Sequence, residues 1–193
     1  MRIHGDKKLT RRLSVERRSP YGAYLDILKE DFSGICGYCG KSESVTKNTF
    51  EIDHFIPQKY APERKEDYSN LVYSCYVCNR KKSSKWISEN KDIQFVDGAG
   101  FVDPASEEFD NHLERDEQGN IIGKTAAGRY MVTEGFEFDK RPIKEIYKAM
   151  LLLEKKRQLR EKMSTVAPEE LQEYIAMDEL LEQIQGMLFE KKE

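Results

Sequence analysis

The sequence contains no apolar run that approaches the roughly 18 uncharged residues needed to cross a membrane. Near its first residue it also lacks the apolar segment by which a secreted chain is recognised. No internal repeat and no low-complexity segment is visible. The 193-residue chain is therefore expected to be a soluble, cytoplasmic protein with no membrane partner, and its 38% hydrophobic content suffices for a modest core.

The sequence also lacks the excess positive charge of a uniformly basic nucleic-acid binder, since its net charge is −3. The charge is nevertheless uneven: residues 1–19 hold seven lysines and arginines against two carboxylates, and residues 163–193 hold eight carboxylates against two lysines. A single basic run is usually a solvated face, but two runs that flank the cysteine region favour contact with phosphate groups. In the second run, the residues considered for this contact are Arg80, Lys81, Lys82 and Lys85.

Cysteine is scarce, and its four copies form two C-x-x-C pairs, Cys36/Cys39 and Cys75/Cys78. Two thiolates in one tight turn can bind a metal ion, and a second pair completes the tetrahedral shell that structural zinc prefers. Disulfides would need an oxidising compartment, and a redox site would not need a second copy. The sequence therefore predicts a structural Zn²⁺ site that closes around a long insertion.

A strand, a loop, a second strand and a helix are predicted across the cysteine region. Residues 49–55 alternate as a strand does, residues 71–73 can pair back with them, and residues 76–86 suit a helix. A short amphipathic helix over residues 21–32 leads into the first cysteine pair. These elements predict an α+β protein built on a ββα unit.

The segments on either side are predicted from turn and capping signals. Residues 1–20 have no sustained apolar periodicity and are expected to form an arm rather than a packed element. Residues 109–115 and 121–124 flank a turn and predict a hairpin. Thr125 can then cap a short helix that runs to about Gly135.

Two longer helices are expected near the end of the sequence. One begins at Pro142 and runs to about Met163, and the other begins at Pro168. The second carries an apolar stripe at helical spacing, which favours the internal seam of a helical hairpin over a partner site. The stripe consists of Tyr174, Met177, Leu181, Ile184 and Leu188.

Three polar residues inside and just after the cysteine frame can support phosphodiester hydrolysis. His54 suits a general base, because neutral imidazole accepts a proton near pH 7. Asp53 and Asn79 offer hard oxygen ligands for an ion such as Mg²⁺ or Mn²⁺. Neighbouring strand residues point to opposite faces, so Asp53 and His54 can share a site only if the strand ends or bulges there, as Pro57 allows.

The segment Glu51-Ile52-Asp53-His54-Phe55-Ile56-Pro57, then Asn70-Leu71 and Cys75-x-x-Cys78-Asn79-Arg80-Lys81-Lys82, resembles the zinc-stapled, four-cysteine branch of the HNH endonucleases. The resemblance covers roughly residues 32–86, with Asn79 in place of the final histidine, as in many members. It implies a ββα-metal core, with His54 as general base and Asp53 and Asn79 as ligands of the catalytic ion. It further implies that Asn70 orients the loop holding His54, and that Glu51 assists metal binding as in some relatives.

The remainder is similar to the HNH subunits of Septu-type anti-phage systems. The similarity rests on Phe101-Val102-Asp103-Pro104, the stretch Phe109-Asp110-x-His112, and Gly119-Asn120-Ile121-Ile122-Gly123. It implies a nuclease that works beside an ATPase partner, with the C-terminal helices as docking surface or as a contact between copies. The N-terminal arm departs from the pattern of that group.

We therefore expect four parts: a basic arm (1–20), an HNH nuclease core (21–90), a hairpin and short-helix extension (91–140) and a C-terminal helical hairpin (141–193). The expected function is divalent-metal-dependent cleavage of nucleic acid, with DNA favoured, in anti-phage defence. The alternative is a non-catalytic, zinc-stabilised nucleic-acid-binding or assembly module. That alternative would leave Asp53, His54 and Asn79 without a role.

Overall fold

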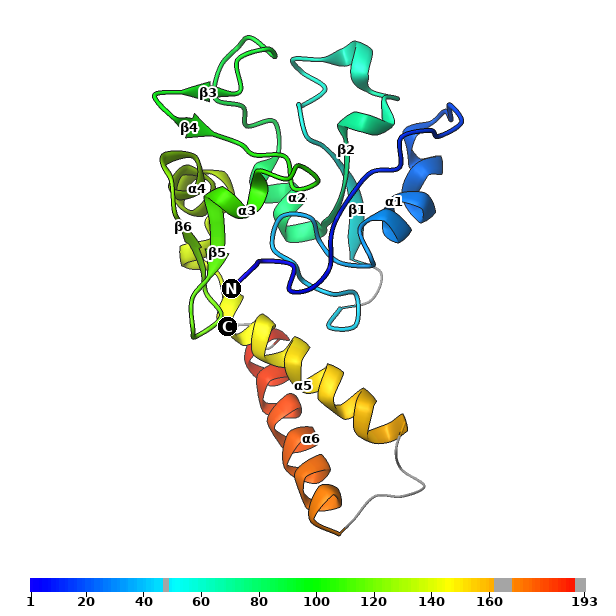
Figure 1. Cartoon of the computed structure of the whole chain (residues 1–193), viewed down its shortest axis with the longest axis vertical. Helices are drawn as coiled ribbons and strands as arrows, with labels where there is room; N and C mark the ends of the chain where they lie inside the picture. The colour runs from blue at the N-terminus through cyan, green and yellow to red at the C-terminus, as the bar shows by residue number, and fades with distance from the viewer. Residues whose placement is uncertain (47–48, 162–167, 190–193) are drawn as a thin grey trace.

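The computed structural model describes residues 1–46, 49–161 and 168–189. Figure 1 shows a body that carries the labelled strands, and a pair of helices that projects away from it. The two projecting helices are α5 (Ile143–Glu161) and α6 (Pro168–Phe189). Among the helices of the described part of the chain, none combines the length and apolar character of a membrane span.

The body is organised around a two-stranded antiparallel sheet and one helix. Strand β1 (Phe50–His54) pairs with β2 (Leu71–Cys75), and α2 (Tyr76–Lys82) continues directly from β2. The register sets His54 opposite Leu71 at one end of the sheet and Phe50 opposite Cys75 at the other. The predicted ββα unit within an α+β fold is confirmed.

Helix α2 is shorter than the sequence predicted. It ends at Lys82 because Ser83 adopts a positive φ of 48°, which breaks the helical path well before Trp86. The indole of Trp86 instead packs edge-on against Phe55, with ring centroids 5.5 Å apart. Helix α1 (Leu25–Asp31) also packs against β2, and β2 is buried along its whole length.

The cysteine region and the extension that follows it share one hydrophobic core. Phe101 and Phe136, both from the extension, are fully buried in the same cluster as Phe32 and Tyr73. At Gly37 an added Cβ would lie only 2.8 Å from the ring of Phe32 and 3.0 Å from Pro104, so the first cysteine turn is pressed against the extension.

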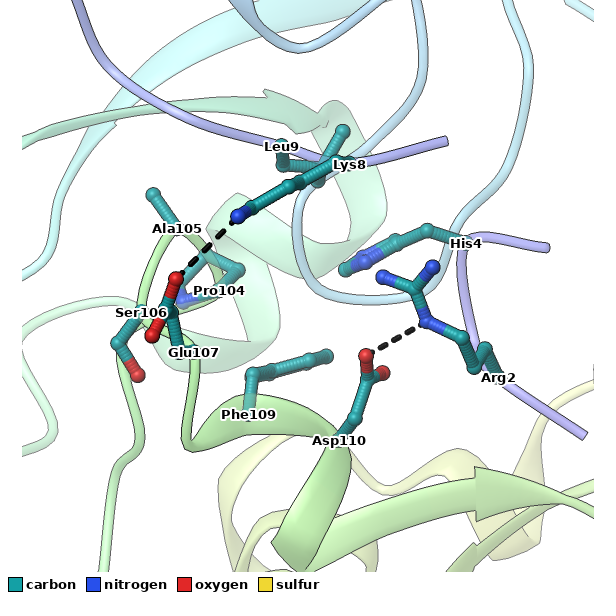
Figure 2. Close-up of a pocket in the computed structure, with 10 residues that line it drawn as sticks. All are labelled: Arg2, His4, Lys8, Leu9, Pro104, Ala105, Ser106, Glu107, Phe109 and Asp110. Atoms are coloured by element: carbon teal, nitrogen blue, oxygen red, sulfur yellow. Dashed lines mark hydrogen bonds and ion pairs between the residues drawn. The ribbon is translucent and has the colours of Figure 1, made fainter. Parts of the chain in front are cut away.

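Residues 1–20 contain neither helix nor strand, as predicted, but they are packed and do not form a free arm. Ile3 and Leu9 are only 2% and 5% exposed and belong to the main core. The imidazole of His4 stacks on Phe109 with ring centroids 5.2 Å apart (Figure 2). Burial of these two aliphatic side chains holds the segment against the body although it forms no helix or strand.

The positive charge of this segment is largely paired within the protein. Figure 2 shows two of these pairs, in which Arg2 and Lys8 reach carboxylates of the extension. Arg11 pairs with another carboxylate of the extension and Arg12 pairs with two carboxylates of α1, so four of the seven basic residues of this segment contact an acidic side chain. The partners are Asp110 for Arg2, Glu107 for Lys8, Asp103 for Arg11, and Glu30 with Asp31 for Arg12.

The extension contains two short hairpins and several helical turns. The first hairpin, β3 (Phe95–Val96) with β4 (Ala99–Gly100), was not predicted, and the second, β5 (Leu113–Arg115) with β6 (Ile121–Gly123), was. Residues expected to begin the second hairpin form a helical turn instead, α3 (Phe109–His112). Thr125 caps α4 (Ala126–Tyr130) by accepting a hydrogen bond from the Gly128 amide, and a π-helical turn (Met131–Gly135) follows. A short 3-10 turn, Phe138–Lys140, ends the extension. Three further 3-10 turns lie earlier in the chain, at Tyr21–Tyr24, Pro62–Arg64 and Tyr68–Asn70.

Helices α5 and α6 form the predicted helical hairpin with a small core of its own. Met177, Leu181 and Ile184 of the apolar stripe are buried, and Leu181 and Ile184 cluster with Ala149 of α5. Tyr174 is half-buried beneath the ammonium group of Lys156. The end predicted for α5 at Met163 and the side chain of Leu188 lie outside the described residues.

Packing of the N-terminal segment can be tested with two leucines that differ in burial. Replacing Leu9 with Ala is expected to lower the free energy of unfolding by about 2–5 kcal/mol, because a buried side chain is removed from the main core. Replacing Leu13, which is 106% exposed, should change it by less than about 0.5 kcal/mol. Urea denaturation of both variants measures the difference. Equal effects would mean that the segment is not packed in solution.

Candidate metal centre and active site

The four cysteines form a compact cluster at one end of the β1–β2 sheet. Their sulfur atoms all lie within 4.8 Å of one another, and all four side chains are buried. The Cys39 and Cys75 sulfurs are 3.9 Å apart, close to the roughly 3.8 Å that a tetrahedral site with Zn–S bonds of about 2.3 Å requires. All four are free thiols, and the separation far exceeds a disulfide bond of about 2.05 Å. The donor set therefore fits a closed metal site of the predicted kind.

Three side chains from outside the cysteine region contact this cluster. The guanidinium group of Arg141 lies 3.4 Å and 3.5 Å from the Cys78 sulfur, and Arg115 donates to the Cys39 carbonyl at 2.6 Å. His4 contacts the Gly37 carbonyl through Nε2 at 2.6 Å. Four thiolates with a divalent ion carry a net negative charge. The two guanidinium groups would partly neutralise this buried charge.

Tyr38, inside the first cysteine turn, connects the cluster to the predicted active site. Its hydroxyl donates to Oδ2 of Asp53 at 2.5 Å, and the side chain is completely buried. Burial, together with the Asp53 carboxylate, raises the pKa of Tyr38 well above its usual value, so the phenol remains a donor. The cysteine turn therefore fixes one oxygen of Asp53 directly.

His54, the last residue of β1, is 6% exposed and has a defined ring orientation. Its Nε2 lies 2.9 Å from the backbone carbonyl of Lys65. A carbonyl oxygen can only accept, so Nε2 carries the hydrogen and Nδ1 of the neutral ring holds the lone pair. The amide nitrogen of Gln58 donates to that Nδ1 at 3.2 Å, and the ring of Tyr21 packs edge-on at 4.8 Å.

The surroundings of His54 favour the neutral form of its ring. Burial lowers the pKa of His54 below its usual value, although the hydrogen bond to Lys65 and the Asp53 carboxylate oppose that shift. A neutral imidazole whose Nδ1 carries a lone pair can accept a proton there once the Gln58 amide moves aside, which is the property that a general base needs.

Asp53, His54 and Asn79 line one open cavity of about 280 Å³. Asp53 is 5% exposed, and its Oδ1 receives no hydrogen bond from any described residue. Asn79 donates through its side-chain nitrogen to Glu51 at 2.7 Å, which leaves its amide oxygen as the atom for a ligand. One carboxylate and one amide oxygen fit a hard cation, which completes its shell with water or phosphate oxygens. Strand β1 ends at His54, which meets the condition set by strand geometry for Asp53 and His54 to face one cavity.

Asn70 lies behind the loop that follows His54 and is 1% exposed. Its side chain accepts from the Ile56 amide at 2.9 Å and donates to the Ile56 carbonyl at 3.0 Å. Its backbone carbonyl accepts from the Phe55 amide at 2.8 Å. These three bonds fix the backbone immediately after His54, which is the contact that the predicted orienting role requires.

The basic run after Cys78 is placed differently from the sequence prediction. Lys82, expected to contact phosphate, is completely buried, with its ammonium group 3.3 Å from Oδ2 of Asp53. Burial lowers the pKa of Lys82, opposed by Asp53. The expected phosphate contact is therefore wrong for this side chain. Arg80 and Lys81 pair with Glu51 and Glu137, and Lys85 donates to the backbone carbonyls of residues 134 and 135.

Several residues around the two sites had not been identified from the sequence. Gln58 follows His54 by four residues within one loop, so proximity in sequence was an available signal. For Tyr38 the sequence signal was weaker, since only its position between Cys36 and Cys39 suggested that it lies near the metal site. Arg115 and Arg141 lie far along the chain from the cysteines, and no local pattern connects them to the cluster.

The comparisons with known proteins agree with this geometry. Residues 36–85 match the family model of the HNH endonucleases, so the two strands, the helix and the cysteine cluster form an HNH domain. The chain is also similar to the Septu protein PtuB of Bacillus mycoides (strain KBAB4), with 26% identity over 145 residues. That similarity covers 62% of this chain and 48% of PtuB, so the chain spans about half the length of this curated relative. No solved structure matches the chain.

The contact between Arg141 and Cys78 predicts a role in holding the metal. In zinc-loaded protein, Arg141→Met should weaken zinc affinity by about 10- to 100-fold, because the Cys78 thiolate loses its charged donor. Competition with a chromogenic chelator measures this. Arg129→Met, which removes an exposed guanidinium from α4, serves as the control and should match the wild type. Equal zinc retention in both variants would contradict the prediction.

Proposed function

We propose that the chain is a divalent-metal-dependent endonuclease that hydrolyses phosphodiester bonds, with DNA as the favoured substrate. The observation that carries the proposal is the orientation of His54. Its Nε2–H is bonded to a backbone carbonyl, and its Nδ1 lone pair belongs to a ring that lines the same cavity as Asp53 and Asn79. This is the arrangement of a base beside ligands for a cation, inside a domain that matches the HNH family model.

In the proposed reaction, His54 accepts a proton at Nδ1 from a water molecule that attacks the phosphorus atom in line. The Gln58 amide, which donates to Nδ1 in this structure, must give way to that water or hold it. Asp53 and Asn79 would hold a divalent cation, whose charge would offset negative charge on the phosphate and on the departing 3′ oxygen. Asn70 keeps the backbone after His54 in place. The products carry 5′-phosphates.

Contact with the nucleic-acid backbone is proposed for Arg80, Lys81 and Lys85, whose present partners are carboxylates or carbonyl groups. Lys59 is an additional residue for this role. It is exposed, lines the cavity, and forms no ion pair with any residue in the described ranges. A lysine beside the reacting phosphate would attract the substrate, and the attraction would weaken as salt is raised.

A role in anti-phage defence is proposed from the similarity to the Septu protein PtuB. The family resemblance implies an ATPase partner, and the α5–α6 hairpin is the surface proposed to bind it. This hairpin projects from the body (Figure 1). It also carries four exposed apolar side chains. They are Leu151, Leu171, Ile175 and Met187, with exposed fractions of 49% to 66%.

The nuclease proposal is tested by cleavage of supercoiled plasmid with His54→Ala. Cleavage by the wild type should require added Mg²⁺ or Mn²⁺, and the variant should lose at least about 100-fold in rate because the proton acceptor is gone. DNA binding, zinc content and thermal stability should stay close to the wild type. His112→Ala, which removes a histidine outside the cavity, is the matched control and should cleave normally.

The ion requirement is best measured by omitting and then adding Mg²⁺ while zinc content is monitored, since a chelator could also remove zinc from the cysteines. Full cleavage by His54→Ala would eliminate the assignment. If the isolated wild type binds DNA without cutting it, addition of the ATPase partner separates a silent nuclease from a non-catalytic binding module.

The pH dependence of kcat/KM should report the titration of His54. Because burial lowers its pKa below the ordinary value of 6.5, the rate should be level above pH 7 and fall only as the pH drops below about 6.5, where the ring becomes protonated. The midpoint should be the same with Mg²⁺ and with Mn²⁺, since it belongs to a side chain. A midpoint above pH 7, or one that moves with the metal, would assign the proton acceptor to another group.

A further inference from the structure

The ammonium group of Lys82 is 0% exposed and lies directly beneath the proposed active site. It donates to the backbone carbonyl of His54 at 2.7 Å and lies 3.3 Å from Oδ2 of Asp53. It also sits over the ring of Phe101, 5.7 Å from the centroid. A lysine is almost never fully buried unless it is paired, and here both polar partners belong to the Asp53–His54 dipeptide.

We propose that Lys82 is a positioning residue of this site, whose buried ammonium group holds Asp53 and His54 in the orientation that the site requires. The proposal rests on the proposed nuclease function for its catalytic consequence. The geometric part, that Lys82 fixes the direction of the His54 ring and the Asp53 carboxylate, stands without it.

The geometry of β1 explains why such a residue is needed. Side chains of consecutive strand residues point to opposite faces, so Asp53 and His54 do not share a cavity by strand geometry alone. Lys82 contacts one residue through its carboxylate and the other through its backbone carbonyl. A single group from α2 therefore joins the two residues at the point where the strand ends.

The two oxygens of Asp53 are used differently. Oδ2 receives the Tyr38 hydroxyl at 2.5 Å and faces the Lys82 ammonium group, whereas Oδ1 has no hydrogen bond from the described part of the chain. Holding Oδ2 from the interior leaves Oδ1 as the oxygen available to the cavity that Asp53 lines. Lys82 would thus act through Asp53 and His54, without contacting substrate.

The test uses the full chain and Lys82→Met, which keeps the apolar length of the side chain and removes its donor and charge. Ring signals of the three histidines, read by NMR, give a measure of position that does not depend on activity. The His54 signals should move, while those of His4 and His112 stay at their wild-type positions. Lys41→Met is the matched control, because Lys41 is also buried, at 7% exposed, but bonds to Thr46.

In cleavage assays, Lys82→Met should lose about 100-fold or more in kcat with KM nearly unchanged, since a small displacement of reacting groups has that effect and no substrate contact is removed. Lys41→Met should cleave as the wild type does. His54 signals that move no further than in Lys41→Met, or a wild-type kcat, would overturn the proposal. If the wild type does not cleave even with the ATPase partner added, the nuclease function fails, and the histidine signals still decide the role of Lys82.

Lys82→Met leaves the Asp53 carboxylate buried without a cation and could fail to fold. In that case it is combined with Asp53→Asn, which removes the opposite charge, and compared with Asp53→Asn alone. A further displacement of the His54 signals in the double variant supports the proposal, because the donor to the His54 carbonyl is still missing. Identical His54 signals in the two variants would overturn it.

Discussion

Four cysteine sulfurs that lie within 4.8 Å of one another hold the β1–β2 sheet and α2 in their relative positions. One pair lies in a turn after α1, and the other joins the end of β2 to the start of α2. When these pairs meet, the angle between sheet and helix is fixed, and Asn79 follows the last cysteine at a set position. The first turn also presents Tyr38 to Asp53. The cysteine cluster therefore positions both proposed oxygen ligands, Asp53 through Tyr38 and Asn79 through Cys78.

A second theme is that positive charge in this chain is used mainly inside the molecule. Arg115 and Arg141 contact the cysteine cluster, Lys82 lies beneath the Asp53–His54 dipeptide, and Arg11 joins the N-terminal segment to the extension. Exposed pairs of this kind contribute little to stability, but buried ones are costly to break. The basic runs that suggest a broad phosphate-binding surface in the sequence therefore act first as internal partners, and the exposed cations that line the proposed site cavity are fewer than the sequence suggests.

The sequence was sufficient to predict those parts of the candidate sites whose residues lie close together along the chain. The cysteine pairs, the Asp53–His54 dipeptide and Asn79 are all local patterns, and the alternation of strand side chains already requires the strand to end or bulge if Asp53 and His54 share a site. Prediction failed where contacts are long-range. The burial of Lys82 depends on its contact with Phe101, and the packing of Leu9 depends on a core to which the extension contributes. The early end of α2 depends on the positive φ of Ser83. A glycine at this position would have indicated such a backbone conformation in the sequence, but a serine does not.

The α5–α6 hairpin has its own small core, and its exposed apolar residues lie apart from the cavity. A partner bound there would not touch the residues that line the proposed site, whereas a change in the cysteine cluster would move Tyr38, which holds Asp53. We propose that a metal ion bound by the four cysteines positions the active site and takes no part in the reaction. The decisive measurement is plasmid cleavage by protein verified to be free of zinc, with excess Mg²⁺ present. Cleavage should be lost and should return when zinc is restored, and undiminished cleavage by the zinc-free protein would mean that the metal does not position the site.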